Sequence, residues 1–412
     1  MVASTTRFGP DSGLSEQVLV VVAPGQGSQS PGFLTPWLEV PGVTERLRWL
    51  SVVSGVDLIK HGTESDAETI RDTAIAQPLL VGAGLVTLLS LFPHPAEAFG
   101  RVAAGAGHSV GEITAASAAG VMSAEQAMVF VRERGKAMAA AAARTATGMT
   151  AVLGGDYDEV MASIAKHGLT AANQNGAGQI VAAGTLEQLA AFAADPPTGA
   201  RLRELQVAGA FHTEHMREAV DVLAHLSRAI TTHDPRTKVI SNRDGEIVHN
   251  GREVLRRLVE QVSNPVRWDR CMTTMVDLGV TAFIEIPPAG TLAGLAKRAL
   301  PGVEIVSLRT PADLPEALDL LARHGTPSPL ADSPTWRLLV APTKGQFRAA
   351  VAIEDGIELS AGKPIGHVVS LRDEVAILAP HGGTVVEWLV VDGDPVSPGQ
   401  PLVRLHPVAV PA

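Results

Sequence analysis

The stretch that decides the fold is Gly107-His108-Ser109-Val110-Gly111-Glu112. It follows a small apolar run over 102–106 and precedes a helical pattern that starts at Ile113. This is the G-x-S-x-G spacing of a sharp turn from strand to helix, in which glycines let the backbone pass closely. The turn leaves Ser109 at a helix N-terminus, where free N–H groups and the helix dipole favour negative charge. Ser109 is therefore a candidate nucleophile. A plain Gly/Ser turn is the alternative, because the bare motif also occurs by chance.

The composition is that of a large acidic chain, with 412 residues, 46% hydrophobic residues, a net charge of -10 and a pI near 5.7. The length predicts two to three domains. The acidic balance gives no electrostatic footprint for nucleic acid or for an anionic membrane. The polar start of the chain and the lack of a run of about 18 apolar residues predict a cytoplasmic protein without a membrane helix. The single cysteine, Cys271, excludes an internal disulfide and a cysteine metal cluster, and no metal site is expected.

Strand and helix signals alternate along the chain, which predicts a mostly parallel α/β sheet. An apolar strand over 18–23 leads into the glycine-rich loop 25–29, where backbone N–H groups can meet an anion. The loop has neither Walker nor dinucleotide-binding spacing. Pro78 is expected to start an apolar helix over 79–91, and Ser123 is expected to cap a helix that runs to about residue 143.

The remaining organisation follows from changes of rhythm. Residues 148–208 read β-α-β-β-α-β, which predicts a ferredoxin-like small subdomain inserted into a large α/β subdomain. The predicted divisions are a disordered tail over 1–16, a large subdomain over 17–147 and 209–322, a linker over 323–335, and an all-β domain over 336–412. Two similar ten-residue stretches within the last domain, 356–365 and 393–402, predict a quasi-symmetric sandwich.

A reactive serine needs a base, oxyanion donors and a group that selects the acyl chain. Spacing alone cannot choose the base, since the chain has 13 histidines. His212 is favoured because it ends an expected strand over 208–211 in a loop of small residues. His215, one helical turn further on, is its rival.

Six motifs in this order resemble the malonyl-CoA:acyl carrier protein transacylases over about residues 17–320. They are Pro24-Gly25-Gln26-Gly27-Ser28-Gln29, the stretch 107–112, Arg132-Glu133-Arg134-Gly135-Lys136-Ala137-Met138, Gly209-Ala210-Phe211-His212, Gln261-Val262-Ser263-Asn264-Pro265-Val266-Arg267-Trp268 and Glu285-Ile286-Pro287-Pro288-Ala289-Gly290. The resemblance implies a hydrolase-like, mostly parallel core with a ferredoxin-like insert. One departure is Pro288-Ala289-Gly290, where the family usually has Gly-Pro-Gly, and it lies off the chemistry.

The resemblance also implies roles. Ser109 would take the malonyl group as an ester, and His212 would be its general base and later the acid for the leaving thiolate. A backbone carbonyl near Gln261 would orient the imidazole, giving a dyad without a catalytic aspartate. The backbone N–H groups of Gln26 and Val110 would form the oxyanion hole. Packing or hydrogen-bond filling is the alternative role for the side chains of Gln26 and Gln261.

Substrate selection is assigned by the same resemblance to Arg134, whose planar guanidinium would hold the free carboxylate of malonate with two parallel hydrogen bonds. Without the resemblance, Arg134 would be interpreted as part of a solvated helix face. Phe211 beside the histidine goes with malonyl rather than methylmalonyl, although one methylene is discriminated only weakly.

A second resemblance covers roughly residues 336–407 and is to biotinyl/lipoyl carrier domains, through Ala379-Pro380-His381-Gly382-Gly383-Thr384-Val385-Val386 and the run 393–402. Those domains carry a modified lysine at a hairpin tip, where this chain has Arg372; Lys344 and Lys363 lie away from the tip. A guanidinium is no usable amine nucleophile. We therefore expect no biotin, no lipoate and no other cofactor. The domain is expected to dock a partner, such as the acyl-CoA carboxylase that makes malonyl-CoA, or to mediate self-association.

The function predicted from these residues is ping-pong transfer of malonyl from malonyl-CoA to the phosphopantetheine thiol of acyl carrier protein, for fatty acid or polyketide elongation. Candidate contacts for an acidic carrier protein are Lys136, Arg144, Lys297 and Arg298. A serine thioesterase or lipase is the rival enzyme, and it has no use for Arg134. A non-catalytic scaffold built around the carrier-like domain is the rival from another class.

Overall fold

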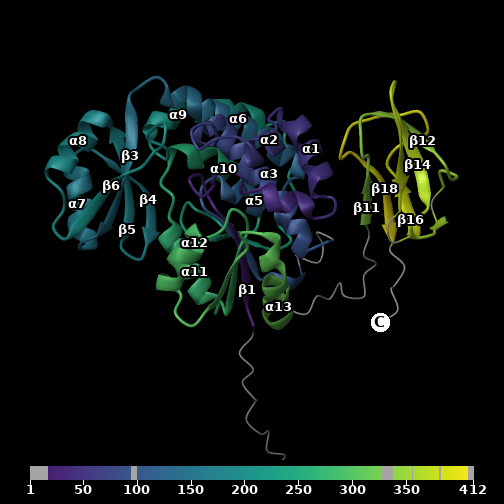
Figure 1. Cartoon of the computed structure of the whole chain (residues 1–412). Helices are drawn as coiled ribbons and strands as arrows, with labels where there is room; N and C mark the ends of the chain where they lie inside the picture. Colours follow the sequence, from purple (N-terminus) through teal and green to yellow (C-terminus); the bar gives the residue numbers. More distant parts are fainter. Residues whose placement is uncertain (1–16, 94–99, 326–336, 355, 380–381, 407–412) are drawn as a thin grey trace, which may run out of the picture.

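The computed structural model describes residues 17–93, 100–325, 337–354, 356–379 and 382–406, which Figure 1 draws in colour. The predicted tail over 1–16 and most of the predicted linker over 323–335 lie outside the described residues. Pro380 and His381 of the second resemblance do so as well.

The central strand of the largest sheet, β1 (Leu19–Ala23), is apolar throughout and fully buried. The sheet order is β10-β9-β1-β2-β7-β8, and β7–β8 is its antiparallel pair. The other strands are β2 (Ala104–Gly107), β7 (Lys238–Ile240), β8 (Ile247–Val248), β9 (Ala282–Glu285) and β10 (Glu304–Ser307). A continuous apolar run is what a parallel strand needs when helices cover both faces. The predicted parallel core is therefore present.

Helices cover both faces of this sheet. Alternate β1 side chains such as Leu19 and Val21 pack with α3, α5 and α6, whereas Val20 and Val22 pack with α11 and α12. The α-helices of the large subdomain are α1 (Val43–Ser54), α2 (Leu58–Thr63), α3 (Thr73–Leu91), α5 (Gly111–Ala118), α6 (Ala124–Ala142), α9 (Arg217–Ser227), α10 (Gly251–Glu260), α11 (Trp268–Asp277), α12 (Thr291–Ala299) and α13 (Leu314–His324). Short 3-10 turns are η1 (Thr35–Glu39), η2 (Thr69–Arg71), η3 (Glu214–Met216), η4 (Gln261–Ser263) and η5 (Pro311–Asp313).

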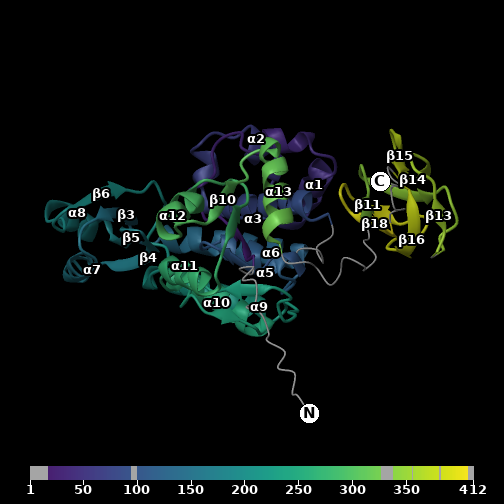
Figure 2. The same cartoon turned by 90° about the horizontal axis from the view of Figure 1, so that it is seen from below.

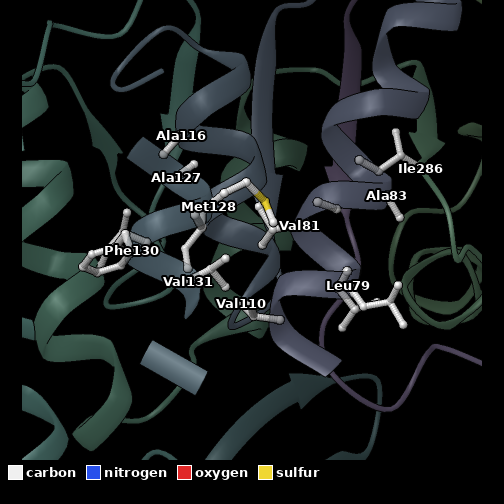
Figure 3. Close-up of a cluster of buried hydrophobic side chains, with 14 of the residues drawn as sticks. Leu79, Val81, Ala83, Val110, Ala116, Ala127, Met128, Phe130, Val131 and Ile286 are labelled. Atoms are coloured by element: carbon white, nitrogen blue, oxygen red, sulfur yellow. The ribbon is translucent and has the colours of Figure 1, made fainter. Parts of the chain in front are cut away.

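Helix α3 is the core helix of this subdomain. Figure 3 shows its Val81 beside Met128 and Val131 of α6, with Val110 close by. By length and composition α3 could cross a membrane, with a mean hydropathy of 1.9, but 67% of that window is buried inside the fold. Polar residues such as Thr73, Gln77 and Thr87 interrupt its apolar sequence, so it contains no continuous apolar run of about 18 residues.

Two predicted ends differ from the structure. The helix expected to start at Pro78 starts at Thr73, because Asp72 caps it by accepting a hydrogen bond from the backbone N–H of Ala74, and Pro78 lies inside it. Helix α13 runs to His324, two residues into the predicted linker, because the His324 ring bonds the hydroxyl of Thr281. Ser123 does cap α6, with the reciprocal bond of a capping box.

The small subdomain has the predicted β-α-β-β-α-β order. Its elements are β3 (Thr147–Gly154), α7 (Tyr157–Lys166), β4 (Thr170–Gly176), β5 (Gln179–Thr185), α8 (Leu186–Ala194) and β6 (Ala200–Glu204). The antiparallel sheet order β4-β5-β3-β6 is that of a split β-α-β unit. Figures 1 and 2 both place β4 next to α11 and α12 of the large subdomain, and the backbone N–H of Gln174 donates to Val266 there.

The described C-terminal residues form two antiparallel sheets around one apolar core. The strands are β11 (Arg337–Val340), β12 (Gly345–Ala349), β13 (Glu358–Leu359), β14 (Pro364–Val369), β15 (Glu374–Leu378), β16 (Gly383–Trp388), β17 (Pro395–Val396) and β18 (Pro401–His406). The repeat 356–365 supplies β13 and the start of β14, and the repeat 393–402 supplies β17 and the start of β18. The short strand of the first repeat, β13, lies in the same sheet as β18, the longer strand of the second repeat. The other sheet holds β14 and β17. This exchange makes the sandwich quasi-symmetric.

Candidate active site

The turn between β2 and α5 holds Ser109 in the left-handed backbone conformation, with φ at 53°, which residues other than glycine rarely adopt. Such a residue costs of order 1–3 kcal/mol and persists only where its surroundings impose it. The two flanking glycines are required by contact. A Cβ on Gly107 would lie 2.0 Å from the backbone of Gly111, and a Cβ on Gly111 would lie 2.2 Å from the carbonyl oxygen of Ala23. The elbow predicted from the sequence is therefore set by sterics.

His212 reaches this serine from the segment after the small subdomain. Its Nε2 lies 2.7 Å from Ser109 Oγ, and its Nδ1 lies 2.7 Å from the backbone carbonyl oxygen of Gln261. A carbonyl can only accept, so Nδ1 carries the proton and Nε2 is free to accept the serine proton. Burial and, to a lesser extent, the positive charge of Arg134 lower the pKa of His212 to about 3. The imidazole is therefore a neutral base throughout the physiological range.

Arg134 lies on the buried side of α6 and approaches the same oxygen. Its side chain is 0% exposed, and its Nη2 lies 3.4 Å from Ser109 Oγ. Two neutral side chains hold it, since Gln77 accepts from Nη1 at 2.7 Å and Gln261 accepts from Nη2 at 2.8 Å. Its Nε has no partner among the described residues. Burial lowers the pKa of Arg134, yet a guanidinium stays charged at neutral pH. This buried cation has no directly bonded carboxylate, which is the arrangement that favours an anionic ligand.

Glu112 is a buried carboxyl group behind Arg134, and Gln261 connects the two. The Gln261 amide donates from Nε2 to Glu112 Oε2 at 2.6 Å while its Oε1 faces the guanidinium. Burial raises the pKa of Glu112 to about 7, against the opposing effect of the hydrogen bonds it accepts. Gln261 thus serves three partners: its carbonyl orients His212, its Oε1 holds Arg134, and its Nε2 satisfies Glu112.

The glycine-rich loop after β1 supplies the other wall of the site. Among the hydrogen bonds of the described residues, none is donated by the backbone N–H of Gln26 or of Val110, whereas the N–H of Ser109 is taken by Asn242 at 2.7 Å. These two N–H groups, which the family resemblance assigns to the oxyanion hole, have no partner among the described residues. The Gln26 side chain donates to the carbonyl of Arg71 and to the hydroxyl of Thr73, both at 3.3 Å, which fixes the loop.

A cleft of about 480 Å³ opens between the two subdomains beside Gln26 and His108. Its walls include Arg71 from one subdomain and Arg203 and Leu205 from the other side. A long flexible substrate arm can enter the site through it. Phe211, next to the base in the chain, is 6% exposed and belongs to the core of the large subdomain.

The other sequence candidates lie away from this centre. His215 is on η3, and only His212 of the two bonds Ser109 among the described contacts. Cys271 is fully buried, and burial raises the pKa of its thiol, as for an inert core cysteine. The candidate carrier-protein contacts are on exposed positions of two elements: Lys136 and Arg144 at α6 and its end, Lys297 and Arg298 in the last turn of α12. Lys136 and Arg144 form ion pairs with Glu133 and Glu218.

Sequence reasoning missed three residues of the site: Gln77, Glu112 and Asn242. Glu112 stood in the quoted elbow motif but was read only as part of the pattern. Asn242 follows the carboxyl end of β7, the neighbour of β2 in the sheet, and such an edge is where side chains of an α/β site collect. Gln77 gave no local signal, since an apolar stretch surrounds it.

Comparison with known proteins places these residues in context. Residues 20–310 match the family described as the acyl transferase domain. The malonyl CoA-acyl carrier protein transacylase of Mycobacterium tuberculosis (strain ATCC 25618 / H37Rv) is 47% identical over 303 residues, which are 74% of this chain and 100% of that protein.

Two solved structures have a similar fold. The crystal structure of MCAT from Mycobacterium tuberculosis is 47% identical with a TM-score of 0.71, and the match covers 73% of this chain and 99% of that one. A structure of a type II PKS acyl-carrier protein in complex with its malonyl-transacylase, PlMCAT:AntF, is 29% identical with a TM-score of 0.68, again over 73% and 99%. The family match ends before the C-terminal sandwich begins.

Proposed function

The chain belongs to the acyl transferase family and, within it, to the malonyl CoA-acyl carrier protein transacylases, and we propose that Ser109 carries the malonyl group between the two thiols. The observation that carries this proposal is the convergence on one oxygen. Ser109 Oγ lies 2.7 Å from the neutral imidazole of His212 and 3.4 Å from the guanidinium of Arg134. A base and a fixed cation thus flank the nucleophile from two sides.

In the first half-reaction, Ser109 Oγ attacks the thioester carbonyl of malonyl-CoA while its proton moves to His212 Nε2. The carbonyl oxygen becomes an oxyanion that the N–H groups of Gln26 and Val110 can receive. Collapse of this intermediate breaks the C–S bond. The departing CoA sulfur takes the proton from His212, which leaves a malonyl ester on Ser109 and a neutral imidazole.

In the second half-reaction, the phosphopantetheine thiol of acyl carrier protein attacks the ester. Its proton passes to His212, and the same imidazole then returns a proton to Ser109 Oγ as the C–O bond breaks. The product is malonyl-acyl carrier protein, which feeds fatty acid or polyketide elongation. The exposed cations on α6 and α12 are our candidate contacts for the acidic carrier. The soluble interior of the cell is the compartment we propose for this reaction.

Arg134 supplies selectivity for a dicarboxylic acyl group. Its free Nε and its Nη2 face no carboxylate among the described contacts, so the terminal carboxylate of malonyl can provide one. An acetyl group would leave the buried cation without an anion, which is costly where water is excluded. The buried Phe211 beside the base disfavours the extra methyl of methylmalonyl, by only about 1–3 kcal/mol.

Intact-mass measurement tests the proposal directly. Mixing the chain with malonyl-CoA should add one malonyl group, and holo acyl carrier protein should then remove it and gain the same mass. Ser109→Ala should show neither change. An unmodified wild-type chain, or an adduct that persists in Ser109→Ala, would disprove the assignment. Rapid loss of the adduct to water, with no transfer, would favour the thioesterase reading.

For the C-terminal sandwich we propose a biotinyl/lipoyl-like domain without the modified lysine, used for docking. Its two exchanged repeats support the likeness. The hairpin between β14 and β15 carries Leu371 and Arg372, both exposed, where such domains carry lysine. A carboxylase that makes malonyl-CoA is the partner we favour, with self-association as the alternative.

Co-purification compares the full chain with a chain that ends at residue 330. The full chain should retain a carboxylase subunit that the shortened chain loses. A shift in the oligomeric state of the full chain alone would favour self-association instead, and identical partners and sizes would remove the docking proposal.

A further inference from the structure

Asn242 bonds the backbone of the strained turn that carries Ser109. It follows β7, which pairs in parallel with β2, so the ends of the two strands meet at the elbow. Its Oδ1 accepts a hydrogen bond from the backbone N–H of Ser109 at 2.7 Å, and its Nδ2 donates to the carbonyl oxygen of Gly107 at 2.8 Å. Asn242 is 0% exposed and lies 133 residues from Ser109 in the chain.

The orientation of this amide is fixed by its neighbours. Oδ1 faces two donors, the N–H of Ser109 and the Nε2 of Gln261 at 3.3 Å, and Nδ2 faces a carbonyl. A flipped amide would set donors against donors and oxygen against oxygen, which no hydrogen-bond pattern allows. The backbone N–H of Asn242 in turn donates to Glu112 Oε2 at 3.3 Å. Each polar group of Asn242 that faces the site therefore has an assigned partner.

Asn242 also connects the nucleophile to its two helpers. Through Gln261 it reaches the residue whose carbonyl orients His212 and whose Oε1 holds Arg134. Among the described contacts, no other side chain bonds the backbone N–H of Ser109. A non-glycine residue at φ 53° relaxes unless its surroundings hold it. Asn242 bonds the carbonyl of Gly107 and the N–H of Ser109, so it holds the backbone on both sides of His108, directly before Ser109, and thereby helps to set the position of Oγ relative to the imidazole.

We propose that Asn242 is a positioning residue. It holds the turn so that Ser109 Oγ stays within hydrogen-bond distance of His212 Nε2, and it thereby sets the rate of Ser109 acylation. It touches neither substrate nor the reacting atoms. It acts through the backbone of Ser109, and its loss leaves the N–H of Ser109 and the carbonyl of Gly107 buried without partners. The proposal rests on the proposed function only for the choice of malonyl-CoA as acyl donor.

The test separates positioning from simple stability by comparing a rate constant with an amplitude. In single-turnover reactions of the full chain, Asn242→Ala should lower the acylation rate constant about 100-fold, because misplacement by about 1 Å costs that much. The KM for malonyl-CoA should change less than about threefold, since Gln77 and Gln261 still hold Arg134. A merely structural role would lower the amplitude, which reports the folded fraction, and leave the rate constant unchanged. That outcome would overturn the proposal.

A second probe makes the test independent of the acyl donor. A fluorophosphonate labels an activated serine without any need for Arg134, so its labelling rate on Ser109 should fall to a similar extent in Asn242→Ala. If the wild-type chain accepts the fluorophosphonate but no malonyl group, the proposed function fails while the Asn242 inference is still decided. Cys271→Ser is the matched control, because Cys271 neighbours Asn242 at 3.8 Å without bonding Ser109, and it should stay within about twofold of wild type.

Asn242→Asp provides a rescue that packing alone does not predict. The introduced carboxylate still accepts from the N–H of Ser109, but it has no proton to donate to Gly107 until it is protonated. The groups that face this position are Glu112 through the backbone N–H and Cys271 beside Nδ2, and burial favours protonation of the introduced carboxylate. Glu112, with a pKa of about 7, also gains a proton in this pH range, and the wild-type chain controls for that change. Fluorophosphonate labelling should therefore be slow at pH 8 and recover as pH falls towards 5, while wild type stays level. A slow rate at every pH, with the chain folded, would contradict the role given to the Gly107 bond, and a fast rate at every pH would contradict the whole proposal.

Discussion

Two turns of this molecule carry the residues on which its function was predicted, and they are held in opposite ways. At the elbow, Ser109 adopts a φ of 53° and its N–H is taken by Asn242, a residue distant in the chain. At the hairpin tip of the C-terminal sandwich, Ser370 closes the turn with its own neighbours, since its N–H donates to Asp373 and its Oγ accepts from Arg372 and Asp373. The first turn is imposed by tertiary contacts, and the second is made locally.

The difference teaches where chemistry can reside. A locally closed turn is stable by itself and presents exposed side chains such as Leu371 and Arg372, which suits recognition. A strained turn needs remote support, but it places an oxygen at a chosen distance from a base and a cation. Reactivity in this chain therefore belongs to the part whose local structure is least favourable by itself.

Removal of the base, His212, should have the largest effect on the reactivity of the strained turn. His212→Ala is expected to lower the acylation rate by about 10⁴-fold or more, because no other base is bonded to Ser109 Oγ in the part of the chain that the structure describes. Single-turnover mass spectrometry with malonyl-CoA measures this. His215→Ala, three residues further on, is the matched control and should act at close to the wild-type rate. A large loss in the control instead would move the base to η3.

Arg134→Ala sharpens the comparison by removing the cation and leaving the strained turn intact. Burying the malonyl carboxylate without a partner should cost about 3–5 kcal/mol, or roughly 10²- to 10⁴-fold in kcat/KM for malonyl-CoA. The rate with acetyl-CoA should hold or rise. Arg132→Ala, on the same helix but half-exposed and paired with Glu133, should change little. An unchanged kcat/KM for malonyl-CoA in Arg134→Ala would contradict the role of Arg134 and favour the thioesterase or lipase alternative.

The pH profile is expected to show a smaller effect, and its sign follows from the lowered pKa of His212. The neutral imidazole is the active form, so activity is lost only as pH falls towards a pKa of about 3. Acylation should therefore keep nearly its full kcat/KM at pH 5.5, where a histidine with the ordinary pKa of about 6.5 would have lost about tenfold. Initial rates between pH 5 and 8 measure this. A midpoint near 6.5 would mean that the base is solvated during turnover.

The smallest effect is expected at the hairpin tip. Arg372→Lys should leave malonyl transfer within about twofold of wild type, because the tip lies outside the matched transacylase residues. With a biotin or lipoate ligase and its cofactor, however, the variant should gain one modification by intact mass, because a lysine at the tip restores the amine. Lys344 and Lys363 serve as internal controls and should stay unmodified. A variant that no ligase accepts would argue that the sandwich differs from carrier domains at its tip.

Much of the fold could be predicted from the sequence, because its signals are local. The apolar run of β1, the capping box of Ser123 and the split β-α-β rhythm each depend on neighbours in the chain. Pro78 was placed wrongly for a related reason. A proline usually opens a helix, but here Asp72 caps the chain earlier and burial of α3 holds the extra turn.

The site was predicted less completely, and the missing residues share one property. Gln77, Glu112 and Asn242 are buried polar groups whose partners lie 57, 149 and 133 residues away in the chain. No spacing rule connects such pairs, since only the folded sheet brings them together. The G-x-S-x-G spacing supplied Ser109, the end of an expected strand favoured His212, and the family resemblance supplied Arg134. No such signal marked the supporting roles of Gln77, Glu112 and Asn242.

By itself, the sequence determined where the turn that carries Ser109 lies, because glycines stand at 107 and 111, where the close contacts leave no room for a Cβ. It also determined that position 372, at the tip of the hairpin, holds a guanidinium and not an amine. Only the tertiary structure decided which groups hold Ser109 in place and activate it. The parallel sheet sets Asn242 beside the elbow and Gln261 between His212, Arg134 and Glu112, because hydrogen bonds between buried groups form only where packing has already removed water.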